Sequence, residues 1–161
     1  MNRICLFPGT FDPVTLGHTD IINRALPLFD KLVIGIGRNL NKVPMFSEQK
    51  RLQWLRDIYK DNPKVEATVY EGLTVDCCKQ QGANFILRGI RYVNDFEYEK
   101  AIADMNRSLE GNIETLFLTC LPQFTSVAST LVRDVLKNGG DVSRFLPAEV
   151  NETIKQNGLR K

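Results

Sequence analysis

The only histidine of the 161-residue chain, His18, ends the run Thr15-Leu16-Gly17-His18, between the turn-rich segment 7–13 and an apolar-periodic helix. A helix start carries unpaired backbone N–H groups and the positive end of the helix dipole, so an imidazole there adds a donor to an anion site. Gly17 lets a ligand approach the backbone closely. The pattern indicates phosphate chemistry, and the alternative is a surface histidine beside a glycine turn.

Three further segments are rich in basic or hydroxyl side chains, and each follows an apolar run. They are Arg38 to Lys42, Arg88 to Arg91 and Leu121 to Thr130. With the segment around His18 they supply His18, Lys42, Arg88, Arg91 and the hydroxyls of Thr10, Thr125, Ser126, Ser129 and Thr130. This set of donors suits several phosphates and predicts a polyphosphate substrate.

The basic residues also have structural interpretations. Lys42 lies in a polar loop, where a lysine is more often solvated than bound to a ligand. Arg88 and Arg91 flank a glycine at a strand end and would repel each other unless an anion lay between them. Planar guanidinium forks match phosphate oxygens, which favours ligand binding for this pair. The alternative is pairing with one of the acidic residues that follow, Asp95, Glu97 and Glu99.

Ser129 and Thr130 have a second interpretation as well. Their hydroxyls could cap the helix that begins near Leu131. Capping and anion binding use the same helix end and do not exclude each other.

Strand-like and helix-like segments alternate along the chain. The predicted strands are Ile4–Phe7, Leu32–Ile36, Val65–Tyr70, Phe85–Leu87 and Ile113–Leu118. Apolar residues at helical spacing lie between them, and Ser47 is placed to cap the second helix. One face of the longest helix is marked by Tyr98, Ile102, Met105 and Leu109. Short helices are expected from about residue 141, the last one opened by Pro147.

This alternation predicts an α/β fold with right-handed crossovers: a doubly wound, mainly parallel five-stranded sheet, Rossmann-like, in a single domain over residues 1–161. Ligands bind such sheets beyond the carboxyl ends of the strands. The four donor segments all follow predicted strands, so we expect them to meet at that edge.

The composition is that of one compact intracellular domain, with 43% hydrophobic and 25% charged residues. The 21 basic and 19 acidic residues leave a net charge of +2, which provides no general attraction for nucleic acid or an anionic membrane. Pro8, Gly9 and Asp12 end the first apolar run before a signal peptide or membrane span could form, so we expect a soluble, cytoplasmic protein. Neither disulfides nor a structural metal is expected, because the four cysteines show no C-x-x-C spacing and only one histidine is present.

The signatures of several other enzyme classes are missing. No G-x-x-x-x-G-K-[ST] loop occurs, and the segment Gly35 to Leu40 lacks the third glycine of a dinucleotide fingerprint. A serine hydrolase would need a G-x-S-x-G elbow, which is absent as well.

The run Phe7 to His18 resembles the [TH]-x-G-H signature of the nucleotidyltransferase superfamily. Four further segments extend the resemblance over nearly the whole chain, namely Lys42 to Phe46, Arg88 to Glu99, Met105 to Arg107 and Asp141 to Pro147. With these motifs the chain is similar to the bacterial phosphopantetheine adenylyltransferase family.

The resemblance implies adenylyl transfer from ATP to 4′-phosphopantetheine, which gives dephospho-CoA and pyrophosphate in the penultimate step of coenzyme A synthesis. The attacking group is already a phosphate anion, so the reaction needs positioning and charge neutralisation more than a strong base. The family also implies Mg²⁺ bound mainly through the ATP phosphates, with no protein metal ligand. A homohexamer and feedback binding of coenzyme A are implied in the same way.

The resemblance assigns roles to individual residues. His18 would stabilise the transition state at the α-phosphate, and Lys42 and Arg88 would hold the acceptor phosphate in line. The implied acceptor site comprises Thr10, Lys42, Leu73, Thr74 and Arg88. The implied ATP site comprises Thr10, Phe11, His18, Gly89, Ile90, Arg91, Glu99, Phe124, Thr125, Ser126, Val127, Ala128, Ser129 and Thr130.

Three positions depart from the family pattern. Ala128 stands where relatives usually carry a serine, so altered ATP contacts are expected rather than loss of activity. Phe7 stands where tyrosine is frequent, and Thr74 replaces a more apolar residue.

Other functions within the same superfamily are compatible with much of this sequence pattern. They are a nicotinate or nicotinamide mononucleotide adenylyltransferase and a cytidylyltransferase. The Arg88 to Glu99 run favours the pantetheine interpretation over both. A non-catalytic nucleotide sensor that binds ATP at the same edge is a third alternative.

Overall fold

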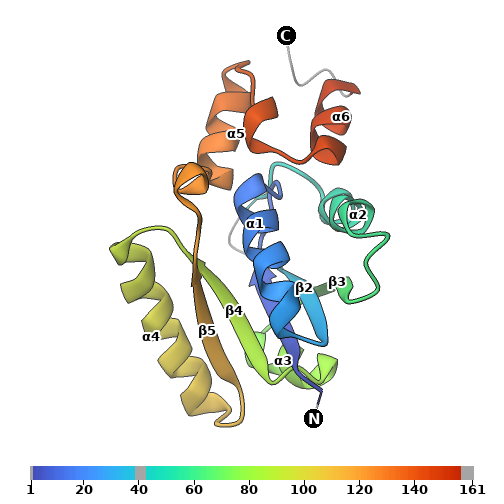
Figure 1. The fold of residues 1–161 in the computed structure, drawn as a ribbon. Helices are drawn as coiled ribbons and strands as arrows, with labels where there is room; N and C mark the ends of the chain where they lie inside the picture. The colour runs from blue at the N-terminus through green and yellow to red at the C-terminus, as the bar shows by residue number, and fades with distance from the viewer. Residues whose placement is uncertain (1, 39–42, 157–161) are drawn as a thin grey trace.

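The computed structural model describes residues 2–38 and 43–156. Within these ranges the strands form a five-stranded, fully parallel sheet in the order β3-β2-β1-β4-β5 (Figure 1). The strands are β1 Ile4–Gly9, β2 Lys31–Gly37, β3 Val65–Tyr70, β4 Phe85–Ile90 and β5 Glu114–Thr119. The predicted doubly wound α/β fold is confirmed, because the chain builds from β1 first toward one edge and then toward the other.

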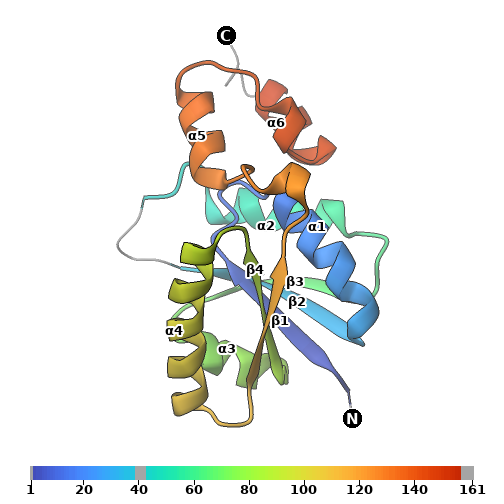
Figure 2. The same cartoon turned by 60° about the vertical axis from the view of Figure 1, so that its left-hand side comes forward.

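Helices cover both faces of the sheet, as the turned view in Figure 2 shows. The helices are α1 Leu16–Ala25, α2 Glu48–Ile58, α3 Thr74–Gln81, α4 Val93–Leu109, α5 Ser129–Lys137 and α6 Ala148–Gln156. Helices α1 and α2 pack on one face, α3 and α4 on the other, and α5 and α6 lie beyond the carboxyl ends of the strands (Figure 1). In the described part of the chain, none of them has the length and apolar character needed to cross a membrane.

The apolar strand residues divide between two cores because successive side chains point to opposite faces of the sheet. Cys5 and Ile34 belong to the larger core beneath α1 and α2. Leu6 and Val33 belong to the smaller core beneath α3. This burial on both faces explains why the inner strands β1 and β2 read as continuous apolar runs rather than as alternating ones.

Two strands extend at their carboxyl ends by more than one residue beyond the prediction, β1 to Gly9 and β4 to Ile90. The expectation that Arg88 follows the fourth strand is therefore wrong, since its backbone pairs with Phe117 of β5. A charged residue is accommodated inside this strand because its guanidinium finds carboxylate and carbonyl acceptors close to the sheet.

The apolar face predicted for the longest helix does not pack on the sheet. On α4, Tyr98, Met105 and Leu109 are each more than half exposed, and Ile102 is half-buried. The helical spacing is as predicted, but the face that it marks is largely free of contact within the chain.

The four cysteines are free thiols, and Cys5, Cys77 and Cys78 are buried. Burial raises the pKa of all three thiols, that of Cys78 to about 12. These three side chains therefore stay protonated at neutral pH and act as small apolar groups in the core.

Helix α6 is attached to α2 through the only tryptophan of the chain. Trp54 Nε1 donates to Thr153 Oγ1 at 3.0 Å, and Val150 and Ile154 of α6 join the same core cluster as Trp54. The predicted short helices after residue 141 are thus present and packed against the second helix.

Replacing Thr153 by valine should destabilise the protein by about 1–3 kcal/mol, because the Trp54 N–H loses its acceptor. Denaturant unfolding followed by the fluorescence of the single tryptophan measures the loss. Thr153→Ser keeps the hydroxyl and is the matched control. Equal unfolding free energies for Thr153→Val and the parent protein would show that this hydrogen bond does not hold α6.

Candidate active site

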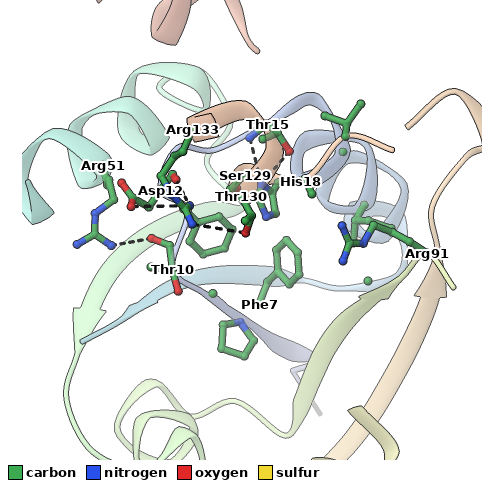
Figure 3. Close-up of a pocket in the computed structure, with 18 of the residues that line it drawn as sticks. Phe7, Thr10, Asp12, Thr15, His18, Arg51, Arg91, Ser129, Thr130 and Arg133 are labelled. Atoms are coloured by element: carbon green, nitrogen blue, oxygen red, sulfur yellow. Dashed lines mark hydrogen bonds and ion pairs between the residues drawn. The ribbon is translucent and has the colours of Figure 1, made fainter. Parts of the chain in front are cut away.

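The imidazole of His18 is fixed by the residue that caps helix α1. Thr15 is the N-cap, and its backbone N–H donates to His18 Nδ1 at 3.0 Å (Figure 3). His18 thus takes the place of the acidic or amide residue at the third position of an ordinary capping box. Since Nδ1 accepts this hydrogen bond, the proton of the neutral ring lies on Nε2, which becomes a donor.

The protonation state of His18 is set by its surroundings. Burial lowers its pKa from 6.5 to about 4, and the charges of Arg91 and Arg88 contribute in the same direction. The ring is therefore neutral at pH 7 and carries a single N–H donor at the start of α1.

The turn before α1 depends on a glycine and on a strained aromatic residue. Phe11 adopts a positive φ of 49° while its ring is buried against Phe7 and His18, with ring centroids 5.6 Å and 5.0 Å away. A Cβ on Gly9 would lie 3.0 Å from the Phe11 ring, which is tighter than most real Cβ contacts. A larger residue at position 9 would therefore require the buried ring to shift by a few tenths of an ångström.

A buried carboxylate braces this turn against the segment that precedes α2. Asp12 accepts the backbone N–H groups of Met45 and Phe46 at 2.8 and 2.9 Å. From α2, the buried Arg51 donates to the carbonyl of Thr10 at 2.6 Å and to that of Phe46 at 3.1 Å. Two chain segments far apart in sequence are thus held together by charge-assisted hydrogen bonds.

Helix α5 is tied to the same turn. Arg133 donates to the carbonyl of Asp12 at 2.5 Å, and Ser129 Oγ donates to that of Pro13 at 2.8 Å. The single hydroxyl proton of Ser129 is therefore used within the protein, although the sequence suggested it as a ligand donor. The N-cap of α5 is Ala128, which offers no side-chain cap to the first N–H groups of the helix.

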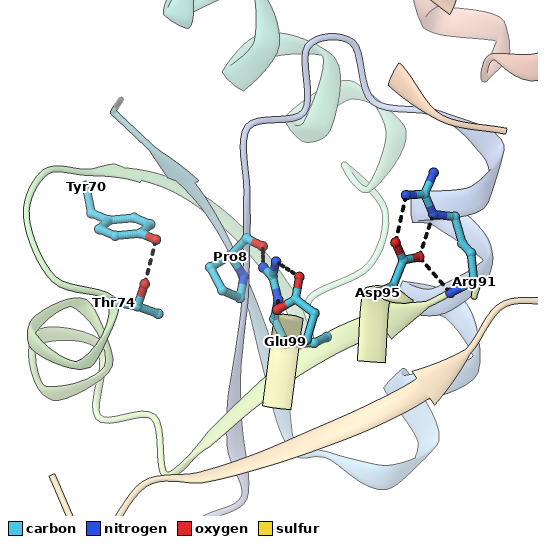
Figure 4. A network of polar contacts seen from close by, with 7 residues as sticks. Pro8, Tyr70, Thr74, Arg91, Asp95 and Glu99 are labelled. Atoms are coloured by element: carbon cyan, nitrogen blue, oxygen red, sulfur yellow. Dashed lines mark hydrogen bonds and ion pairs between the residues drawn. The ribbon is translucent and has the colours of Figure 1, made fainter. Parts of the chain in front are cut away.

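Arg88 and Arg91 are each paired with a carboxylate. Arg88 binds both oxygens of Glu99 at 2.6 and 2.5 Å, and Arg91 binds both oxygens of Asp95 at 3.1 and 3.3 Å (Figure 4). Ion pairing with acidic residues, the alternative to ligand binding, is thus present in the structure. The two guanidinium groups can lie near His18 without an anion between them.

Two cavities adjoin at the carboxyl edge of the sheet. The first has a volume of about 430 Å³ and contains His18 and Arg91 in its lining, and the second has a volume of about 550 Å³ and contains Thr74 and Glu99. Their common wall consists of Pro8, Gly9, Thr10, Gly37 and Arg88. The site therefore has room for two ligands that meet at the end of β1.

The first cavity is lined by most of the residues that the family resemblance assigned to ATP, namely Thr10, Phe11, His18, Gly89, Arg91, Phe124, Val127, Ala128, Ser129 and Thr130. Within the described ranges, Ile90, Thr125 and Ser126 line neither cavity, and Glu99 lines only the second.

Three of the residues assigned to the acceptor, Thr10, Thr74 and Arg88, line the second cavity. Leu73 does not belong to its lining. Lys42 lies outside the residues that the structure describes, so its assignment stays a prediction.

Sequence reasoning missed Asp12, Arg51 and Arg133 as site residues. Arg51 carried a detectable signal, because it shares the helical spacing of the apolar residues Leu55 and Ile58 and is buried like Leu55. Asp12 and Arg133 carried none, since their backbone partners and the 3.8 Å ion pair between the two side chains are brought together only by the fold.

A parallel α/β sheet with a donor-rich site at the point where its strand order reverses defines the class of nucleotide-binding α/β proteins. The sequence profile of the cytidylyltransferase-like family matches residues 6–135. The chain belongs to this family and, within it, to the phosphopantetheine adenylyltransferases.

Relatives of that name support the assignment over nearly the full length. The protein of Flavobacterium psychrophilum is 51% identical over 92% of this chain and 97% of its own. The protein of Bacteroides thetaiotaomicron is 50% identical over 90% of this chain and 95% of its own. A crystal structure of a putative nicotinate-nucleotide adenylyltransferase from Vibrio parahaemolyticus has the same fold, with a TM-score of 0.73 at 20% identity over 99% of this chain and 95% of that one.

The titration of His18 can be followed by imidazole NMR without assignment work, because the chain contains one histidine. We expect the Nε2–H tautomer at pH 7 and a protonation midpoint near pH 4 rather than 6.5. Since the unfolded state takes up this proton first, the free energy of unfolding should fall as the pH drops from 6.5 toward 4. A midpoint above pH 6, or a proton on Nδ1, would contradict the assigned hydrogen bond.

Asp12→Asn should lower the free energy of unfolding by about 1–3 kcal/mol, because an amide cannot accept from both Met45 and Phe46 and leaves a buried N–H unpaired. Chemical denaturation measures the change. Asp61→Asn, a substitution at an exposed position, is the matched control and should stay within about 0.5 kcal/mol of the parent. Equal effects of the two substitutions would argue against the brace.

Proposed function

We propose that the protein transfers the adenylyl group of ATP to 4′-phosphopantetheine, giving dephospho-CoA and pyrophosphate. The observation that carries this proposal is the name shared by relatives about 50% identical over most of the chain. The two adjoining cavities support it, because the reaction requires two phosphate-bearing ligands to meet at one point.

On the ATP side, His18 donates its Nε2–H to an oxygen of the α-phosphate in the first cavity. The neutral ring transfers no proton, and it stabilises the charge that grows on this oxygen in the transition state. Arg91 adds positive charge to the same cavity. The uncapped first turn of α5 offers backbone N–H groups to the remaining phosphates.

On the acceptor side, 4′-phosphopantetheine occupies the second cavity with its phosphate at the wall formed by Thr10 and Arg88. An oxygen of that phosphate forms a bond to the α-phosphorus. The bond from the α-phosphorus to the bridging oxygen breaks, and pyrophosphate leaves with the electron pair. The nucleophile is an anion from the start, so Lys42 and Arg88 need only hold it in line.

The proposed metal is Mg²⁺, bound mainly by the ATP phosphates and water. Among the described residues, no group of three or more His, Cys, Asp and Glu side chains could hold a metal ion. Bound there, Mg²⁺ would supply charge neutralisation for the leaving pyrophosphate.

The exposed apolar face of α4 supports self-association, since large exposed apolar side chains in one region mark interaction sites. Tyr98, Met105 and Leu109 are 69%, 63% and 51% exposed. We propose that this face contributes to the homohexamer that the family resemblance implies. Feedback by coenzyme A would act at the second cavity, because coenzyme A contains the pantetheine arm. The cytoplasmic location of the protein stays a prediction.

His18→Ala should lower the turnover number about 10²- to 10³-fold, a loss of ~2.7–4 kcal/mol, because the α-phosphate loses a preorganised donor. Pyrophosphate release from ATP, Mg²⁺ and 4′-phosphopantetheine measures the effect. An unchanged denaturant unfolding transition, followed by the fluorescence of the single tryptophan, serves as the control for folding. Full activity of the variant would exclude the assigned role.

The same assay separates the rival functions. Nicotinate mononucleotide and nicotinamide mononucleotide replace 4′-phosphopantetheine in parallel reactions, and CTP replaces ATP. Turnover only with one of these substitutes would favour the corresponding transferase. ATP binding without turnover on any acceptor would favour a nucleotide sensor.

A further inference from the structure

Arg51 differs from the other arginines that line the first cavity. Four arginines line it, and three of them form an ion pair with a carboxylate, namely Arg88 with Glu99, Arg91 with Asp95 and Arg133 with Asp12. Arg51, from α2, forms no ion pair with a described residue, although it is only 5% exposed. A buried charge is costly unless an opposite charge or a full set of hydrogen bonds compensates it. The described part of the protein does not supply the counter-charge.

Hydrogen bonds compensate the burial of Arg51 only in part. Nε donates to the carbonyl of Phe46 at 3.1 Å, and Nη1 donates to that of Thr10 at 2.6 Å (Figure 3). A guanidinium has five N–H groups, and these two contacts leave three of them without a partner in the described ranges. Two of the three belong to Nη2. The carbonyl oxygens orient the guanidinium but do not neutralise its charge.

The acidic side chains around Arg51 are already engaged. Arg38 lowers the pKa of Glu48 through hydrogen bonds to both of its oxygens, at 2.6 and 2.9 Å, and the charge of Arg51 contributes less. The carboxylate of Asp12 accepts two backbone N–H groups and forms its ion pair with Arg133. Neither acid is in ion-pair contact with Arg51, so its charge remains available to a ligand.

The position of Arg51 indicates which ligand this is. The residue lines the first cavity and not the second, and the carbonyl that it holds belongs to Thr10 in the common wall. His18 and the uncapped first turn of α5 offer further donors to an anion in the same cavity. A planar guanidinium with free N–H groups matches phosphate oxygens. The expected counter-charge is therefore a phosphate in the first cavity.

We propose that Arg51 is a further ATP-binding residue, whose positive charge is balanced by the phosphates of the nucleotide. The family resemblance assigned Arg51 to neither ligand. The identity of the nucleotide rests on the proposed function, which this inference deepens. Bracing the turn and binding phosphate are compatible roles, because they use different N–H groups of the same guanidinium.

Substitutions separate the charge of Arg51 from its bracing contacts. Arg51→Gln removes the charge and keeps an amide donor for one of the two carbonyls. Arg51→Lys keeps the charge and loses the planar fork. Arg56→Gln makes the same change of charge at an exposed position of α2 and is the matched control.

The experiment measures dissociation constants for ATP with Mg²⁺ and for 4′-phosphopantetheine by calorimetry, and for adenosine by ligand-detected NMR. Adenosine has the base and sugar of ATP but no phosphate. In Arg51→Gln we expect the dissociation constant for ATP to rise about tenfold, the scale of one charge-assisted hydrogen bond, while that for adenosine stays within about twofold. The constant for 4′-phosphopantetheine should change less than that for ATP. Arg51→Lys should recover most of the ATP affinity, and Arg56→Gln should behave as the parent protein.

A purely bracing role predicts a different pattern. It would lower the affinities for ATP and adenosine by the same factor, and equally in both Arg51 variants. That result overturns the proposal, as does unchanged ATP affinity in Arg51→Gln or a larger loss for 4′-phosphopantetheine than for ATP.

If Arg51→Gln does not fold, guanidinium ¹⁵N NMR of the parent protein decides. The Nη–H signals of Arg51, assigned by their loss in Arg51→Lys, should shift with pyrophosphate and Mg²⁺ but not with adenosine. Signals that pyrophosphate leaves unchanged would exclude the contact. Parent protein that binds ATP but releases no pyrophosphate with 4′-phosphopantetheine would contradict the proposed function, and the comparison of ATP with adenosine would still decide the role of Arg51.

Discussion

The hydrogen bond from the Thr15 backbone to His18 Nδ1 is the interaction on which the site depends. It assigns the ring proton to Nε2 and sets the direction in which the ring can donate. Burial keeps the ring neutral, so it stabilises developing charge without adding a permanent positive one. Asp12 and Arg51 hold the segment that precedes Thr15, through hydrogen bonds to backbone groups. The orientation of the His18 ring therefore depends on backbone hydrogen bonds as much as on the imidazole itself.

Sheet topology explains why two ligands meet where they do. Strand β1 lies between β2 and β4, and the chain leaves it through the turn to α1. At such a reversal of strand order the connections diverge to opposite faces of the sheet and open a crevice. Pro8, Gly9 and Thr10 form the divide, with one cavity on each side. A single strand end thus orients both partners of the reaction.

The sequence was sufficient for the parts of the structure that depend on local pattern. Periodicity predicted the five strands, and Ser47 does cap α2 by accepting the Lys50 N–H. It could not predict contacts that arise only in the folded chain, such as those of Asp12 with Met45 and Phe46. Periodicity also marks a face of a helix without showing what covers that face. The exposure of the apolar face of α4 and the burial of Glu99 therefore had to be observed in the structure.

The buried cysteines matter for an enzyme whose proposed acceptor ends in a thiol. Mixed disulfides form when a thiolate attacks one sulfur of a disulfide and displaces the other as a thiolate, and the rate falls with the fraction of attacking thiolate. Cys5, Cys77 and Cys78 are buried and protonated, while Cys120 lines the first cavity rather than the second. Pantetheine that has been oxidised to a disulfide would therefore exchange only slowly with these three residues, because each of them is buried and protonated.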